Sequence, residues 1–335
     1  MHVLGAGSMG CLWAAALTRA GTETRLLLRP GSAKLAACQQ GKVVLRVDGC
    51  RGSKGNETTA TTVHAEALTA GQEADVDQVL VVTKAYSAMN ALEMLAPRLK
   101  REAVIVVLSN GALALHEQIV RATCLSHVRL VLGITTHGVW SRGPFEIVHA
   151  GWGQTRFGTL SVKDTESSDW YRSVLQRLET AGLGAVDEGS NIERCLWLKL
   201  AANAAINPLT ALEEKPNGFI LSCLEARAKV SQICSEVAEV AGALQRNSEQ
   251  DAQVAKLSGL DLEEFVFQTA QETAENRSSM LQDVAAGRLT EIDYLNGWIA
   301  SKAKELGMGS GLNAHVTALM KEKEAAMSAR KARLA

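Results

Sequence analysis

The sequence predicts an α/β domain followed by an all-α domain. In the first half, short apolar runs alternate with amphipathic segments, which is typical of a parallel sheet with helices on both faces. From about residue 166 this pattern changes, and beyond residue 190 nearly every segment has a helical period. A chain of 335 residues is also too long for one ordinary domain. We therefore expect domains at 1–190 and 191–335.

Strands and helices of the first half are expected to follow one another closely. The expected strands are 2–4, 24–28, 78–82, 104–108 and 128–134, and the expected helices are 9–20 and 85–99. Residues 40–65, with the runs GKVVLRVDGC and ETTATTVHA, predict further strands at a sheet edge, and 145–158 predicts a closing β segment.

The second half begins with a helix over 168–181, a short strand in the run AGLGAV and a turn at 188–190. The helical period then recurs in five segments, which are 191–206, 222–247, 261–276, 290–306 and 312–328. We find no internal repeat and no low-complexity linker, so the boundary near residue 190 rests on this change of period.

Composition excludes several classes of protein. The formal net charge is −1, whereas a nucleic-acid binder normally shows a basic excess. The seven cysteines form no Cys-x-x-Cys pair and the histidines lack ligand spacing, so neither a disulfide scaffold nor a metal site is expected, and a reducing cytoplasm fits. No basic leader with an apolar core precedes residue 5, and no apolar run reaches membrane-spanning length.

The turn after the first strand has the spacing G-x-G-x-x-G and opens an amphipathic helix. Its residues are Gly5, Ala6, Gly7, Ser8, Met9 and Gly10. The first glycine permits the tight turn, the second lets the backbone approach a pyrophosphate, and the third lets helix and strand pack closely. Unpaired N–H groups at the helix start favour phosphate. The sequence therefore predicts a Rossmann domain that binds a dinucleotide.

The second strand favours NADP(H) over NAD(H). A site for NAD usually has an acidic residue at the end of this strand, which binds the ribose 2′-hydroxyl. This chain has Arg29 there, whose cation can pair with a 2′-phosphate, and Lys34 could assist. A solvated charge at the strand end is the alternative for Arg29.

Polar residues also follow the next three strands. Lys84, Asn110 and the pair His137-Gly138 each come directly after an apolar run. Ligands of open α/β sheets bind at the carboxyl ends of strands, so we expect these residues at one crevice. Each of them could instead lie in an ordinary loop, and His137 could equally be a structural hydrogen-bonding residue.

The run WLKLAANAAINPLTAL at 197–212 is the most informative stretch. Lys199, Asn203 and Asn207 are spaced four apart, which places them on one face of a helix. One cation and two carboxamides can donate hydrogen bonds and a proton to a ketone oxygen. Pro208 follows directly and is expected to strain or end the helix. The alternative for Lys199 is a lysine whose stem lies along the helix surface.

A second polar group lies in the runs NRSSMLQD at 276–283 and TEIDYLNG at 290–297. Paired serines at a helix end can cap the helix or bind a carboxylate. Glu291 is expected to open a new helix, where a first-turn carboxylate is favourable even without a functional role.

With these residues the chain resembles the ketopantoate reductase family, the 2-dehydropantoate 2-reductases. The resemblance rests on four runs in matching order, GAGSMG at 5–10, LKLAANAAINPLTAL at 198–212, NRSSMLQD and TEIDYLNG. It implies an NADPH-binding Rossmann domain and a helical C-terminal domain, a phosphogluconate-dehydrogenase-like arrangement. It also implies reduction of ketopantoate to (R)-pantoate, the precursor of pantothenate and coenzyme A.

The resemblance implies roles for the residues of the helical half. Lys199 is similar to the family's catalytic lysine. Asn203, Asn207 and Asn217 are similar to its substrate-binding asparagines, and Ser279 is similar to the serine that holds the substrate carboxylate. As hydride reaches the ketone carbon, Lys199 would donate a proton to the oxygen, and desolvation would lower its pKa.

Further residues correspond to the family's cofactor site. Glu291 is similar to the glutamate near the substrate and the cofactor ribose, and the resemblance implies that it would hold Lys199 in place. Lys84 and Asn110 fall where the family contacts cofactor and substrate, as does Gly138, where related chains often carry alanine. Arg29 matches the arginine used for the 2′-phosphate.

Two other functions remain open on the sequence. One is an NADPH-dependent reductase of another branched 2-oxo acid, and the other is a non-catalytic regulator that senses NADP(H). The chain carries Lys199, Asn203, Ser279 and Glu291, which argues against the regulator. The expected partner is a small molecule, without nucleic acid or membrane, and a homodimer is compatible with the sequence.

Overall fold

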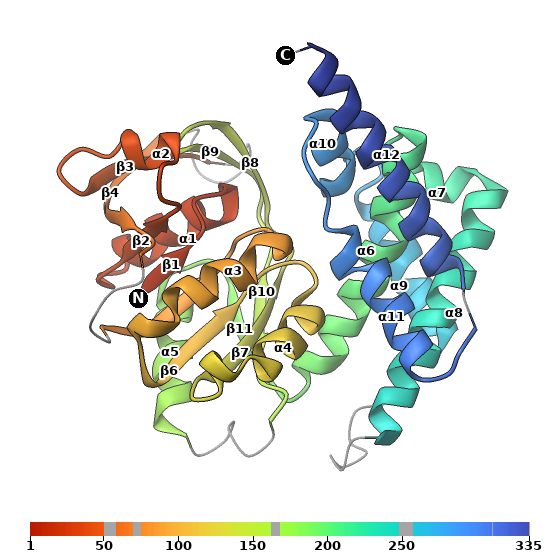
Figure 1. Cartoon of the computed structure of the whole chain (residues 1–335), viewed down its shortest axis with the longest axis horizontal. Helices are drawn as coiled ribbons and strands as arrows, with labels where there is room; N and C mark the ends of the chain where they lie inside the picture. Colours follow the sequence, from red (N-terminus) through yellow and green to blue (C-terminus); the bar gives the residue numbers. More distant parts are fainter. Residues whose placement is uncertain (50–57, 70–74, 162–167, 248–256, 310, 335) are drawn as a thin grey trace. The chain divides into compact units, whose positions relative to one another are not determined.

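The structure is a computed structural model that describes residues 1–49, 58–69, 75–161, 168–247, 257–309 and 311–334. It divides into two compact units, Met1–Glu193 and Arg194–Ala335. The first contains a mostly parallel sheet flanked by helices, and the second is helical (Figure 1). The predicted fold class is therefore confirmed.

Strands of the first unit form one sheet. Their bounds are β1 His2–Leu4, β2 Arg25–Leu28, β3 Lys42–Asp48, β4 Thr58–Ala67, β5 Val76–Val81, β6 Leu99–Val107, β7 Arg129–Thr135, β8 Gly138–Gly143, β9 Glu146–Gly151, β10 Thr155–Gly158 and β11 Ala185–Gly189. Within the described residues, the order across the sheet is β11-β10-β7-β6-β5-β1-β2-β4-β3-β9-β8. The strands from β7 to β4 are parallel to one another.

The edge strands that the sequence predicted at 40–65 are present as β3 and β4. Strand β4 pairs parallel with β2, and β3 returns antiparallel to β4. Alternate residues of β3 are buried, namely Val43, Leu45 and Val47. The expected closing segment splits, because β9 pairs with β3 whereas β10 pairs antiparallel with β7. Cys50 and Glu57, at the ends of the two predicted runs, lie outside the described residues.

Helices of the first unit are α1 Ser8–Arg19, α2 Ala33–Ala36, α3 Ala85–Leu95, α4 Ala112–Arg121 and α5 Asp169–Thr180. Helix α1 contacts α5, and α3 contacts α4. The chain reverses its direction across the sheet after β1 and β2, and right-handed crossovers then place these two pairs on opposite faces. The predicted helix 85–99 is shorter in the structure, since 3-10 turn Ala96–Arg98 follows α3 and β6 begins at Leu99.

The second unit is built from α6 Ile192–Glu213, α7 Phe219–Ser222, α8 Leu224–Asn247, α9 Gly259–Glu272, α10 Ser279–Ala285, α11 Asn296–Glu305 and α12 Leu312–Leu334. Helix α8 contacts α7, α9, α11 and α12 (Figure 1). The prediction of a single helix at 290–306 is wrong, because the structure has two separate elements there. A 3-10 turn at Ile292–Tyr294 comes first, and Leu295, with φ −110° and ψ −100°, separates it from α11.

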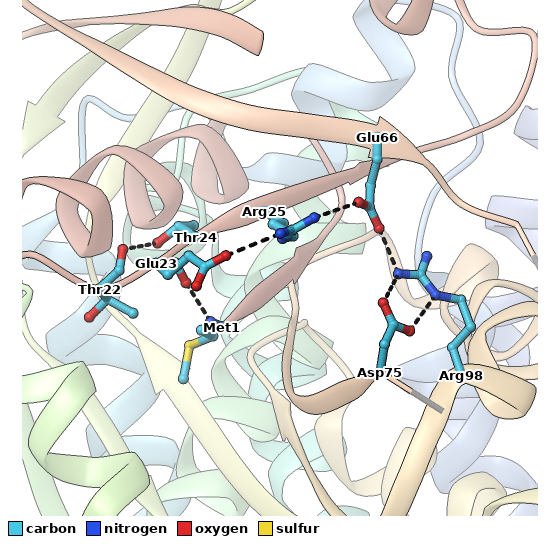
Figure 2. A network of polar contacts seen from close by, with 8 residues as sticks. All are labelled: Met1, Thr22, Glu23, Thr24, Arg25, Glu66, Asp75 and Arg98. Carbon is cyan, nitrogen blue, oxygen red and sulfur yellow. Dashed lines mark hydrogen bonds and ion pairs between the residues drawn. The ribbon is translucent and has the colours of Figure 1, made fainter. Parts of the chain in front are cut away.

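Ion pairs join the amino ends of β2, β5 and β6. Arg98 is 7% exposed, and its guanidinium donates to both carboxylate oxygens of Asp75 at 2.8 and 2.7 Å and to Glu66 at 2.7 Å (Figure 2). Arg25 bridges Glu66 and Glu23 at 3.4 and 3.1 Å. Asp75 precedes β5, Arg98 precedes β6 and Arg25 begins β2. Arg25, Asp75 and Arg98 therefore lie at the amino ends of their strands, whereas Glu66, which joins them, is the second-last residue of β4.

Candidate active site

The three glycines of the turn differ in the space that a side chain would find at each of them. Gly5 has φ +115°, and a Cβ there would lie 2.9 Å from Thr83 Cγ2. A Cβ on Gly10 would lie 1.8 Å from the carbonyl oxygen of Gly5, so α1 approaches β1 too closely for any side chain. Gly7 has no atom within 4 Å of its would-be Cβ. Backbone at Gly7 is thus accessible to a phosphate group.

The start of α1 can hold an anion. Gly7 is the N-cap residue and offers no side chain to the first N–H groups, and the first turn has no acidic residue. Those N–H groups and the positive end of the helix dipole favour phosphate. Residues 5–10 therefore fit the pyrophosphate of a dinucleotide.

Two basic residues lie after β2. Arg29 directly follows the strand, is exposed and makes no ion pair within the described residues. Lys34 lies in α2, donates a hydrogen bond to the carbonyl oxygen of Ala6, and its Nζ is 5.6 Å from the centre of the Phe145 ring. The ammonium of Lys34 thus lies beside the glycine turn.

The carboxyl ends of β5 and β6 bring their polar residues together. Ser109 Oγ donates to the carbonyl oxygen of Thr83 at 2.8 Å, which ties the two strand ends to each other. Lys84 is the N-cap residue of α3, and Asn110 precedes Gly111, the N-cap residue of α4. Both are partly buried. Thr83 was not predicted as a site residue, and its buried Oγ1 has no hydrogen-bond partner within the described residues.

His137 is a structural residue in this structure. Its Nε2 lies 2.9 Å from the carbonyl oxygen of Leu183, so Nε2 carries the proton and Nδ1 accepts from Gly153 N at 3.0 Å. The same Nδ1 lies 3.0 Å from His149 Nε2. Desolvation and the neighbouring His137 lower the pKa of His149 to about 4. Gly138 is exposed and pairs with Gly151.

Helix α6 presents the predicted polar stripe. Asn207 Nδ2 donates to Asn203 Oδ1 at 3.3 Å, so the two carboxamides lie side by side. Lys199 lies one turn earlier and is partly buried, and desolvation lowers the pKa of its ammonium. Within the described residues Lys199 makes no ion pair, and the contact with Glu291 suggested by the sequence is not seen.

Pro208 does not end this helix, and that part of the prediction is wrong. Helix α6 continues through Pro208 to Glu213. A proline in a helix leaves the carbonyl four residues earlier without its usual donor, and here that carbonyl belongs to Ala204. Asn296 Nδ2 donates to it at 2.9 Å. Asn296 lies in the run TEIDYLNG, and no role for it was predicted from the sequence.

The paired serines begin a helix and have separate roles. Ser278 is buried and caps α10 by accepting from Leu281 N at 3.1 Å, and it also accepts from Thr210 Oγ1 at 2.8 Å. Ser279 is the first residue of α10 and is exposed. The hydroxyl of Ser279 is therefore the one accessible to a ligand.

Asn217 and Glu291 are buried polar residues of the same unit. Asn217 Nδ2 donates to Thr273 Oγ1 at 2.9 Å, whereas its Oδ1 has no partner within the described residues. Glu291 is 5% exposed and precedes the 3-10 turn. It begins that turn instead of the α-helix that the sequence predicted. An orphaned acceptor on Asn217 suits a hydroxyl donor on a ligand.

Comparisons with known proteins agree with this arrangement. The chain matches the family model Ketopantoate reductase PanE/ApbA over residues 1–161 and the model Ketopantoate reductase PanE/ApbA C terminal over residues 191–324. The 2-dehydropantoate 2-reductase of Vibrio cholerae serotype O1 is 32% identical over 312 residues, which cover 93% of each chain.

Solved structures share the fold. D-mandelate dehydrogenase, in its ternary structure with NADH and anilino(oxo)acetate, has a TM-score of 0.81 at 23% identity, covering 98% of this chain and 99% of that chain. A PanE/ApbA family ketopantoate reductase from Ralstonia eutropha JMP134 has a TM-score of 0.77 at 23% identity, covering 98% and 100%. These likenesses extend over both units.

The fold and the glycine turn, together with the two family models, define a two-domain, NAD(P)-dependent oxidoreductase. Both family models match in sequence order and together span most of the chain. The chain belongs to the ketopantoate reductase family. None of its described helices is long and apolar enough to cross a membrane, and its described residues contain no group of three or more His, Cys, Asp and Glu placed to hold a metal.

Proposed function

We propose that this protein reduces 2-dehydropantoate (ketopantoate) to (R)-pantoate with NADPH. The observation that carries the proposal is the polar stripe of α6, in which a desolvated lysine precedes two adjacent carboxamides. Reduction of a ketone requires a proton donor at the oxygen and neutral donors that orient it. The nicotinamide of the bound cofactor supplies the hydride.

Lys199 is the proposed general acid. Negative charge develops on the ketone oxygen during reduction, and the ammonium both stabilises this charge and donates the proton. A general acid works best when its pKa lies near the working pH. Desolvation lowers the pKa of Lys199, which moves it in that direction.

The other polar residues of the helical unit would bind the substrate. Asn207 donates to Asn203 Oδ1, which directs the Asn203 amide nitrogen away from Asn207. We assign Asn203 and Asn207 to the carbonyl end, exposed Ser279 to the carboxylate and the Asn217 acceptor to a hydroxyl. Glu291 would accept a hydrogen bond from the substrate hydroxyl.

The first unit would bind the cofactor. Residues 5–10 fit the pyrophosphate, and Lys84, Asn110 and Gly138 follow strands of the same sheet. NADPH is proposed over NADH because Arg29 is exposed at the end of β2, where an acidic residue would favour NADH. A 2′-phosphate there would gain charge-assisted hydrogen bonds.

The test is steady-state oxidation of NADPH by the purified protein with ketopantoate. Parallel assays use NADH as the cofactor, and a simpler branched 2-oxo acid and an aromatic 2-oxo acid as substrates. We expect the highest kcat/KM with NADPH and ketopantoate. A higher kcat/KM with another 2-oxo acid would reassign the substrate. NADPH binding without turnover of any of them would favour the regulator. Sedimentation in the same buffer tests whether the protein is the homodimer with which its sequence is compatible. Fractionation of cells tests the cytoplasmic location that its cysteine content fits.

A further inference from the structure

A proline interrupts the helix that carries the polar stripe. In a regular helix the N–H of residue 208 would donate to the carbonyl oxygen of Ala204. Pro208 has no N–H, and its ring presses against that carbonyl. Ala204 directly follows Asn203 and lies five residues after Lys199. The missing bond therefore falls inside the segment that presents the proposed proton donor.

The side chain of Asn296 replaces the missing donor. Its Nδ2 donates to the Ala204 carbonyl oxygen at 2.9 Å and to Asn313 Oδ1 at 2.9 Å. Asn296 is 0% exposed, so water does not compete for that carbonyl. Both protons of the Asn296 amide are thus used, one on α6 and one on α12.

The orientation of these amides follows from the partly buried carboxylate of Glu236. Glu236 on α8 can only accept, and it accepts from Asn313 Nδ2 at 2.8 Å, Asn313 N at 3.0 Å and Leu312 N at 2.6 Å. Asn313 must then turn Oδ1 towards Asn296, which must in turn offer Nδ2 to Asn313 and Ala204. The chain of bonds from Glu236 to Ala204 therefore has a single direction.

This arrangement leaves one acceptor without a partner. Asn296 Oδ1 is buried and has no hydrogen-bond partner within the described residues. An unsatisfied buried acceptor is unfavourable for folding. The Asn296 amide therefore satisfies two buried acceptors, the Ala204 carbonyl and Asn313 Oδ1, at the cost of its own unsatisfied oxygen.

We propose that Asn296 is a positioning residue for the proposed reduction. It holds the Lys199–Asn203 segment of α6 in place at Pro208, and it lies five residues after Glu291. The Ala204 bond thereby fixes the distance between the polar stripe and the turn that carries the proposed glutamate. This inference rests on the proposed function for its kinetic consequence and on the Pro208–Asn296 pair for its structural consequence.

The kinetic test compares N296A with S258A. Removal of the amide leaves the Ala204 carbonyl without a donor, so the Lys199 segment shifts. A shift of about 1 Å in a catalytic group lowers kcat on the order of 10²-fold, and KM for NADPH should stay unchanged. Ser258 caps α9 through a capping box in the same unit. S258A should lose stability without losing kcat. A kcat for N296A equal to that of S258A would overturn the proposal.

A double-mutant cycle with P208A tests the same link without activity. An alanine at position 208 restores the backbone donor to Ala204, so the Asn296 amide is no longer needed at that carbonyl and keeps only its bond to Asn313. We expect N296A to raise the unfolding equilibrium constant roughly 10- to 100-fold in the wild-type background, and clearly less in the P208A background. Equal effects in both backgrounds would contradict the proposal.

These two measurements separate the failure of the inference from that of the proposed function. If the wild-type protein does not reduce ketopantoate, the kinetic arm is repeated with the 2-oxo acid that it does reduce. In the unfolding cycle, coupling between positions 208 and 296 supports the structural link whatever the substrate. Absence of coupling overturns that link even if the wild-type protein is an active reductase.

Discussion

The candidate site of the first unit is made mainly of backbone groups, whereas that of the second unit is made of side chains. In the first unit the glycine turn offers backbone N–H groups, and its key property at Gly7 is empty space. In the second unit the site is made of side chains, with Lys199, Asn203 and Asn207 on one helix. A backbone site recognises a group that all dinucleotides share, whereas a side-chain site can be specific for one reaction. The helix run is therefore the more informative of the two about function.

Replacement of Lys199 should have the largest effect on kcat of all the variants. A small effect would contradict the view that the side chains of α6 supply the chemistry. We expect Lys199→Ala to lower kcat by roughly 10²- to 10⁴-fold, because the ketone oxygen loses its proton donor. Binding of NADPH, measured by fluorescence titration, should be unchanged. A near-normal kcat would mean that the helix supplies no acid.

The pH profile gives a second readout of the same lysine. Desolvation lowers its pKa, and a general acid is active only when protonated. The wild-type kcat should therefore fall as pH rises through a pKa below the usual 10.5 of lysine. The profile of Lys199→Ala should lack this decrease. An alkaline limb that persists in the variant would assign it to another group.

Two glycines of the turn provide a matched pair. Gly10→Ala places a Cβ against the Gly5 carbonyl and should lower the free energy of unfolding by about 3 kcal/mol or more. Gly7→Ala meets no protein atom, but alanine is a poorer N-cap residue than glycine, so the free energy of unfolding should fall by about 1 kcal/mol or less. Only the second variant should lose NADPH affinity while it stays fully folded. Denaturant unfolding and fluorescence titration measure both effects, and normal affinity in Gly7→Ala would exclude this position as the phosphate site.

In the proposed cofactor site the glycine turn contributes backbone groups, whereas Arg29 contributes a side chain. Loss of a charge-assisted bond to the 2′-phosphate should weaken NADPH binding about 10- to 100-fold in Arg29→Ala, with little change for NADH. Isothermal titration with both cofactors measures the difference. Equal weakening for both cofactors would show that Arg29 does not select between them.

The buried histidines of the first unit should have the smallest effect at neutral pH. The pKa of His149 is about 4 in the folded protein against 6.5 ordinarily, so the unfolded chain binds the proton first as pH falls. The free energy of unfolding should therefore be highest above pH 6.5. It should fall by up to about 3 kcal/mol as the pH is lowered towards 4. His149→Gln should reduce this decline without changing kcat at pH 7, and exposed His64→Gln serves as the control. An unchanged decline in His149→Gln would place the acid sensitivity elsewhere.

Local patterns predicted much of this molecule. The parallel strands follow from apolar runs, and the positions of Lys84 and Asn110 after β5 and β6 follow because polar residues occur where those runs stop. The Asn203–Asn207 pair follows from helical spacing alone. The relevant signals lie within a few residues of one another, and a single sequence shows such signals directly.

Features that depend on distant residues were not predicted. Helix α6 passes through Pro208 with a donor on Asn296, which is 92 positions from Ala204. The buried serine of the pair was identified only by its bond to Thr210, 68 positions away. A proline in a helical pattern indicates a carbonyl without its backbone donor, and a buried asparagine or glutamine can replace that donor. Nothing in the sequence identifies which amide it is.

The ion pairs around Arg98 and the proposed cofactor residues lie at opposite ends of β5 and β6. Arg98 and Asp75 lie at the amino ends of β6 and β5, whereas the proposed cofactor residues Lys84 and Asn110 follow the carboxyl ends of the same two strands. Loss of Asp75 would leave the buried Arg98 guanidinium with fewer partners and is expected to lower the free energy of unfolding. Because this change is made at the other end of β5 and β6, we expect it to leave the affinity for the cofactor unchanged.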